Sequence, residues 1–173
     1  DMDLSRDFRK AFHPAKYRNK FPRCMYPCSV FSAFRSSTVQ PKILKGNWTL
    51  YEDRPGKPGW ISTEPESLMQ VELCFRQKPT FTFTYLRSYE KLGAGRIFLT
   101  GRNVTIAGKW NATAKVSQSE TIFSNAGQTF FRPDSHQVLG FNVKPNSALP
   151  MVIENLKVGA RDNKMKIIEI VSC

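Results

Sequence analysis

The chain of 173 residues lacks the features that mark membrane-spanning helices and several common enzyme classes. No window approaches 18 consecutive apolar residues, so the sequence predicts no membrane span. It has no Gly-x-Ser-x-Gly turn, no P-loop and no Gly-x-Gly-x-x-Gly run. The only two histidines, His13 and His136, have no cysteine or second histidine at metal-ligand spacing. We therefore expect no metal, no cofactor and no catalytic activity.

Acidic residues are also scarce, with 14 Asp and Glu against 26 Lys and Arg, for a net charge of +12. The pairs Glu52-Asp53 and Glu64-Glu66 fall on turn-rich loops, where we expect solvated carboxylates rather than an acid–base couple. Ten of the basic residues lie within residues 1–45, against three Asp. A basic segment of this kind can bind nucleic acid, anionic lipid or acidic polysaccharide.

A period of two residues runs from Gly46 to the end of the chain. "SLMQVELCF" places Met69, Val71, Leu73 and Phe75 on one face, and "FTFTY" does the same for Phe81 and Phe83. "GRIFLTGRNVTIAG" is typical of a hairpin around Gly101. About ten short strands between Pro, Gly and Asn turns, with no convincing helix, predict an all-β fold. We expect an antiparallel, jelly-roll-like β-sandwich over residues 46–173.

Residues 1–45 have no such period and are predicted to form an extended basic N-terminal arm. A short helix over residues 3–12 is possible before Pro14. Seven aromatic residues lie between positions 8 and 34, too many for a free tail. We expect most of them to pack along the sandwich: Phe12, Tyr17, Phe21, Tyr26, Phe31 and Phe34.

Four cysteines, Cys24, Cys28, Cys74 and Cys173, allow two disulfides in three connectivities. We favour Cys24 with Cys28 and Cys74 with Cys173, because the second pair would tie the last strand to an early one. Four free buried thiols are the alternative.

Three N-glycosylation sequons start at Asn47, Asn103 and Asn111, where composition predicts about one by chance. All three fall beside expected strand ends or turns. Together with the even number of cysteines, they favour a secreted or extracellular protein in an oxidising compartment. The chain begins at Asp1 rather than Met, and we expect any targeting segment to lie upstream.

Aromatic and basic side chains supply the candidate ligand-binding groups. Trp60 follows two tight turns and could either cap the core or serve as a sugar-stacking platform. We expect Trp110 to be structural, since a glycan on Asn111 would crowd a ligand there. The strand that contains Tyr85 ends in a polar cluster with Arg87 and Tyr89. These three side chains could contact a ligand, or they could tie down a loop as a tyrosine corner does.

Two short blocks carry a family resemblance. "KPGWIS" at residues 57–62 and "YLRSYEKLG" at residues 85–93 resemble the C-terminal accessory β-sandwich of plant and algal SGNH/GDSL-like extracellular proteins. The resemblance implies an accessory domain, with catalysis carried by a preceding domain that ends near an Asp-x-x-His-Pro element. Here His13-Pro14 is present, but position 10 is lysine and no upstream serine nucleophile is found. The resemblance therefore implies no activity for this chain.

Three functional hypotheses follow from these patterns. The first is a secreted, non-catalytic β-sandwich that binds acidic or neutral polysaccharide, or that packs against protein neighbours in an extracellular glycoprotein assembly. The second is a fragment of an SGNH-type cell-wall esterase without its catalytic domain. The third is a jelly-roll nucleic-acid or virion-type structural protein that uses the basic arm, for which unglycosylated asparagines and reduced thiols are expected.

Overall fold

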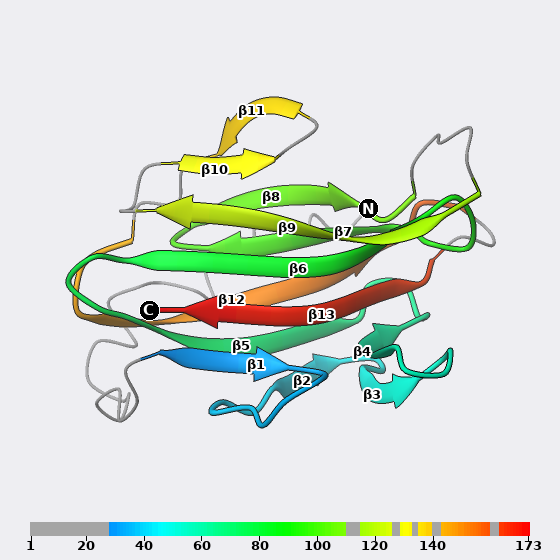
Figure 1. The fold of residues 1–173 in the computed structure, drawn as a ribbon, viewed down its shortest axis with the longest axis horizontal. Helices are drawn as coiled ribbons and strands as arrows, with labels where there is room; N and C mark the ends of the chain where they lie inside the picture. Colours follow the sequence, from blue (N-terminus) through cyan, green and yellow to red (C-terminus); the bar gives the residue numbers. More distant parts are fainter. Residues whose placement is uncertain (1–27, 110–114, 126–128, 133–134, 140–142, 160–162) are drawn as a thin grey trace.

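The computed structural model describes residues 28–109, 115–125, 129–132, 135–139, 143–159 and 163–173. These residues form thirteen strands and no helix, so the expected all-β fold is confirmed (Figure 1). Among them there is no helix long and apolar enough to cross a bilayer. The strands are β1 Ser29–Ser32, β2 Lys42–Lys45, β3 Thr49–Glu52, β4 Pro58–Ser62, β5 Leu68–Phe75, β6 Thr80–Ser88, β7 Ala94–Leu99, β8 Arg102–Ala107, β9 Ser117–Asn125, β10 Thr129–Arg132, β11 Ser135–Leu139, β12 Ser147–Leu156 and β13 Met165–Ser172.

The strands form two antiparallel sheets packed as a sandwich. The eight-stranded sheet has the order β11-β10-β9-β6-β13-β4-β3, with β1 also paired to β13. The five-stranded sheet has the order β2-β5-β12-β7-β8. The chain crosses repeatedly between the sheets, at β1 to β2, β2 to β3, β4 to β5, β5 to β6, β6 to β7, β8 to β9, β11 to β12 and β12 to β13. This is the jelly-roll-like arrangement that the sequence predicted.

Alternating side chains of both sheets build the core. In β5 the residues Met69, Val71, Leu73 and Phe75 are at most 2% exposed, and the residues between them are half-buried. In β6, Phe81, Phe83 and Tyr85 point inward in the same way. The period of two therefore identified the inward faces of these strands.

The β7–β8 hairpin was also correctly predicted. Its two-residue turn, Thr100-Gly101, has positive φ at both positions, 52° and 74°. Two positive φ angles define the type I′ turn, whose twist matches that of paired strands. Glycine adopts this conformation freely, and a β-branched threonine does so at a cost.

The described part of the segment for which we predicted an arm, residues 28–45, contributes a strand to each sheet. β1 pairs with β13, and β2 pairs with β5 at the edge of the five-stranded sheet. Phe31 is fully buried, as expected, whereas Phe34 is 59% exposed. The predicted helix at residues 3–12 and the other arm aromatics lie outside the described residues, and the boundary at residue 45 stays a prediction.

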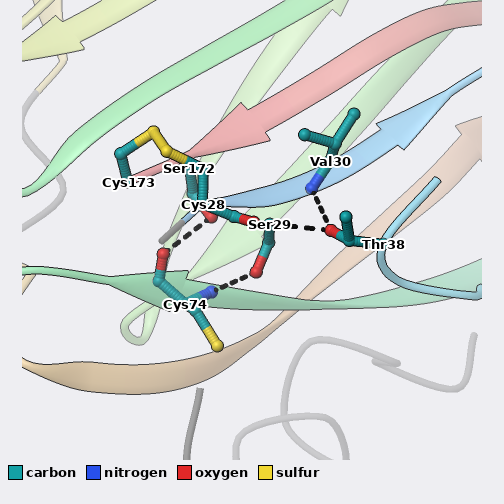
Figure 2. The surroundings of a disulfide bond; sticks show 7 residues. All are labelled: Cys28, Ser29, Val30, Thr38, Cys74, Ser172 and Cys173. Atoms are coloured by element: carbon teal, nitrogen blue, oxygen red, sulfur yellow. Dashed lines mark hydrogen bonds between the residues drawn. A yellow bond between two sulfur atoms is a disulfide. The ribbon is translucent and has the colours of Figure 1, made fainter. Parts of the chain in front are cut away.

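The favoured disulfide pairing was wrong. Cys28 is bonded to Cys173, which excludes both the Cys24–Cys28 and the Cys74–Cys173 pairs (Figure 2). The reason is the register of β1, which sets Ser29 opposite Ser172 and so brings the two neighbouring cysteines together. Cys74 is also in a disulfide, and Cys24 lies outside the described residues. No cysteine among the described residues is free, which argues against the alternative of buried thiols.

Candidate functional site

Trp60 on β4 is a core-packing residue rather than an open platform. Its ring stacks on that of Phe31, with centroids 5.2 Å apart and planes inclined by 30°. The side chain is half-buried and packs against the hydrophobic core. The core-capping alternative therefore fits the contacts of Trp60.

The polar cluster at the end of β6 faces the interior. Tyr85 is 1% exposed, and Glu120 of β9 lies directly opposite it. Arg87 Nη1 donates to Glu120 Oε2 at 2.5 Å, and the two side chains are only 11% and 4% exposed. Tyr89, in the loop after the strand, is half-buried. These surroundings fit the structural alternative, in which the cluster fixes a corner of the sandwich, and a ligand role for Trp60, Tyr85, Arg87 and Tyr89 stays a prediction without support from these contacts.

Two of the three sequons lie in the described residues. Asn47 is exposed between β2 and β3, where its Oδ1 accepts a hydrogen bond from Ser62 at 3.3 Å. Asn103 is exposed on the edge strand β8. Asn111, together with Trp110, lies outside the described residues. Both described asparagines have surface positions that a glycan could occupy.

One acidic loop residue, Asp53, is not solvated as expected, although its neighbour Glu52 is exposed. Asp53 is about nine-tenths buried and accepts hydrogen bonds from Lys164 and Lys166 of the β13 region. Lys166 is 3% exposed and also donates to the Lys57 carbonyl at 2.5 Å. Its side chain lies across Gly59, where any Cβ would collide with it. Burial alone would raise the pKa of Asp53, but the two lysines outweigh burial and hold that pKa below its usual value. The cluster anchors the β3–β4 loop to β13.

A different surface gathers polar groups of the kind that bind ligands. We call it the outer face: the side chains of β5, β12, β7 and β8 that point away from the core. The strand register places Gln70, Val152, Phe98 and Asn103 in one row across this face. A second row contains Leu68, Glu154, Arg96 and Thr105. Because neighbouring strands are about 4.8 Å apart, each row extends for roughly 14 Å across these four strands.

Arg96 is the centre of the polar contacts on the outer face. Its guanidinium lies 5.9 Å from the ring centroid of Phe98, within the range of a cation–π contact. Its Nη1 lies 3.7 Å from Glu154 Oε2, an ion pair longer than a hydrogen bond. Both groups therefore keep hydrogen-bonding capacity for hydroxyl groups of a ligand. Asn103 and Thr105 beside them on β8 are exposed.

Two carboxyl groups of the outer face are partly removed from water. Burial raises the pKa of Glu154, and the positive charge of Arg96 only partly offsets this. Burial also raises the pKa of Glu72 on β5. Val152 lies between the two, and it is 1% exposed although it faces away from the core. The β5–β12 half of the outer face is thus the more buried one, whereas Arg96 and Phe98 on β7 are half-buried and Asn103 and Thr105 on β8 are exposed.

Sequence reasoning missed the outer face and one buried amide. The signal was present, because Gln70, Glu72 and Arg96 occupy the polar positions of alternating strands, but every β-sandwich has such positions. Asn155 is fully buried, and its Nδ2 donates to the carbonyls of Asn163 and Glu64 at 2.7 and 3.0 Å. It connects the end of β12 to the β4–β5 and β12–β13 loops, and a hydrophobic pattern gives no sign of it. No group of three or more metal-ligating His, Cys, Asp or Glu side chains occurs in the part of the chain that the structure describes.

No protein-family model matches the chain, and no curated protein matches its sequence. Solved structures do resemble it. A two-domain esterase (CEX) active on acetylated mannans, co-crystallised with mannopentaose, aligns at a TM-score of 0.55 and 8% identity, over 84% of this chain and 36% of the esterase. A second structure of that esterase aligns at 0.55 and 9%, over 88% and 38%. The CBM36-1 domain of a xylanase from the hindgut metagenome of Trinervitermes trinervoides aligns at 0.49 and 9%, over 84% and 96%.

The likeness to the esterase shows the fold and no more, because the identity is only 8–9%. The chain spans little more than a third of that esterase's length. A β-sandwich of this kind is thus a fold that also occurs as part of a larger two-domain protein.

Proposed function

We propose that the chain is a non-catalytic polysaccharide-binding β-sandwich and that the β7–β8 half of the outer face holds the sugar. The observation that carries the proposal is the half-buried Arg96–Glu154 pair, with the Phe98 ring beside it and the exposed Asn103 and Thr105 next to it on β8. Sugars present hydroxyl groups in adjacent pairs together with apolar C–H faces, so a site for them needs spaced donors and acceptors beside apolar surface. The fold's occurrence in an esterase active on acetylated mannans supports polysaccharide as the ligand class.

Affinity electrophoresis and calorimetry with soluble mannan, xylan and polygalacturonate test this proposal. We expect the wild-type protein to bind at least one of the three. Arg96→Ala should weaken binding at least tenfold, because it removes the donor that Glu154 and Phe98 hold in place. The matched control is Arg35→Ala, since Arg35 pairs with Glu169 on the other sheet at 2.8 Å. If no polysaccharide binds, or if both variants weaken binding equally, the site is wrong.

We also propose that the protein is secreted and that Asn47 carries an N-linked glycan. The Cys28–Cys173 disulfide supports an oxidising compartment, and the exposed position of Asn47 leaves room for a glycan. The intact mass of protein from eukaryotic cells, measured before and after enzymatic deglycosylation, checks this. We expect a loss of mass at Asn47 and none at Asn103, because a glycan on Asn103 would stand opposite Phe98 and compete with a polysaccharide there. An unchanged mass would favour the nucleic-acid hypothesis.

A structural role in an assembly is the second candidate, favoured by two exposed sheet edges. β2 and β3 are edge strands of different sheets, joined by a short loop. They expose Ile43, Leu44, Leu50 and Tyr51 by 37–48%. Exposed apolar edge strands are surfaces on which a protein neighbour can pack. Failure of every polysaccharide to bind would leave this role as the better proposal.

A further inference from the structure

The buried half of the outer face points to an occupant from the chain's own N-terminal segment. Val152 is 1% exposed, yet it points away from the core, and its neighbours across the sheet are Gln70 and Phe98. A side chain in the middle of an open sheet surface would be wetted by solvent. Glu72 and Glu154, on either side of it along the strands, have pKa values raised by burial.

Cys74 identifies the segment that can reach this surface. It lies on β5 between Leu73 and Phe75, both of which face the core, so its side chain belongs to the outer face. Cys74 is in a disulfide, but Cys28 and Cys173 are bonded to each other. Figure 2 shows the Cys74 sulfur pointing away from that bond. The only other cysteine in the sequence is Cys24.

The geometry at the start of β1 permits this link. Ser29 Oγ accepts a hydrogen bond from the Cys74 N–H at 2.9 Å, so the chain enters β1 beside Cys74. Residue 24 precedes Cys28 by four positions, and four residues span at most about 14 Å. A residue four positions before Cys28 can therefore reach Cys74.

The composition of residues 1–27 complements the surface. The segment has seven Lys and Arg against three Asp, and the face that it would meet carries Glu72 and Glu154. It also has five aromatic residues, which would cover the apolar surface at Val152 and Pro150: Phe8, Phe12, Tyr17, Phe21 and Tyr26.

We propose that residues 1–27 dock on the β5–β12 half of the outer face, held by a Cys24–Cys74 disulfide, and leave Asn103 and Thr105 of β8 exposed. The docked segment borders the proposed sugar site and limits it to one side of the sheet. The proposal concerns the chain's own packing and can be tested without any sugar.

Peptide mapping of the non-reduced full-length protein is the first test. We expect one peptide pair that joins Cys24 to Cys74 within a single molecule. A link between two molecules would assign the surface to a second copy, and a free Cys74 would remove the tether; either result overturns the proposal.

Carboxyl labelling with a carbodiimide and an amine gives a second readout. In the wild-type protein Glu72 should label at least fivefold more slowly than Glu64, which is exposed. In the double variant Cys24→Ser, Cys74→Ser, labelling of Glu72 should accelerate at least threefold while that of Glu64 is unchanged. Equal Glu72 rates in wild type and double variant, with an unchanged circular dichroism spectrum, would contradict docking by residues 1–27.

Discussion

At the scale of single residues, the surroundings of two carboxyl groups shift their pKa values in opposite directions. Glu72 lies on the half-buried outer face, where burial raises its pKa above the ordinary 4.5. Asp53 lies between Lys164 and Lys166, which hold its pKa below the ordinary 3.8. A raised carboxyl pKa means that the ionised form opposes folding, whereas a lowered one means that the ionised form stabilises the fold.

The two neutral variants should therefore change stability in opposite directions. At pH 7, Glu72→Gln should raise the free energy of unfolding, and the gain should vanish as the pH falls below 4.5. Asp53→Asn should lower it by about 3 kcal/mol, because Lys166 is left buried without its carboxylate. That loss should vanish as the pH falls through the native pKa of Asp53, below 3.8.

Urea denaturation between pH 3 and pH 7 measures both effects. Glu52→Gln is the control, since Glu52 precedes Asp53 and is exposed. Two variants that changed stability in the same direction at pH 7 would contradict the sign of one of the two pKa shifts.

Prediction from sequence at this scale succeeded for the apolar residues of alternating strands and failed for Asp53 and for Phe34. Phe81 and Phe83 were placed correctly because alternation alone decides which side of a strand is buried. Asp53 was expected in solvent, and its partners come from more than 110 residues away. A pattern confined to neighbouring residues contains no information about such a contact.

At the scale of elements, the β7–β8 turn contains a strained residue, Thr100, whose strain a substitution should relieve. Thr100 has a φ of 52°, and its buried Oγ1 has no hydrogen-bond partner in the structure. Asparagine tolerates positive φ and commonly precedes glycine in type I′ turns. Thr100→Asn should therefore raise the free energy of unfolding by about 0.5–1 kcal/mol.

Thermal unfolding of this variant beside Thr105→Asn checks the prediction. Thr105 lies within β8, where its backbone is that of an ordinary strand, and asparagine is disfavoured in strands. The control should thus be neutral or destabilised. A Thr100→Asn variant less stable than wild type would show that the threonine side chain stabilises the turn.

The positions of the strands were easier to predict from the sequence than the pairing between them. The hairpin could be recognised because its two strands are adjacent in sequence and joined by a turn with a residue signature. β12 was harder, since its buried side contains Asn155 beside Met151 and Ile153, which interrupts the apolar alternation. The outward positions of single strands could be recognised, but the outer face itself could not, because it depends on β5, β12, β7 and β8 being neighbours.

At the scale of the whole molecule, the Cys28–Cys173 bond spans nearly the complete described chain. It closes a loop between residues 145 positions apart, so it strongly restricts the unfolded ensemble. Removing it in a Cys28→Ser, Cys173→Ser variant should lower the free energy of unfolding by about 5 kcal/mol in the chain-entropy description.

Urea unfolding of the non-reduced proteins measures this difference. The Cys24→Ser, Cys74→Ser variant is the comparison. By our inference it opens a loop of about 50 residues, so its free energy of unfolding should fall by about 0.9 kcal/mol less than that of the Cys28→Ser, Cys173→Ser variant. A loss below 1 kcal/mol on removal of Cys28–Cys173 would indicate that the unfolded chain stays compact without the bond.

The last strand occupies the middle of the larger sheet, between β6 on one side and β4 and β1 on the other (Figure 1). During synthesis, every nascent chain that stops short of residue 165 has the hydrogen-bonding edges of three strands unoccupied. Such intermediates are prone to associate with one another. The larger sheet can therefore complete its pairing only after β13 has been synthesised, and its unpaired strands need protection from association until then.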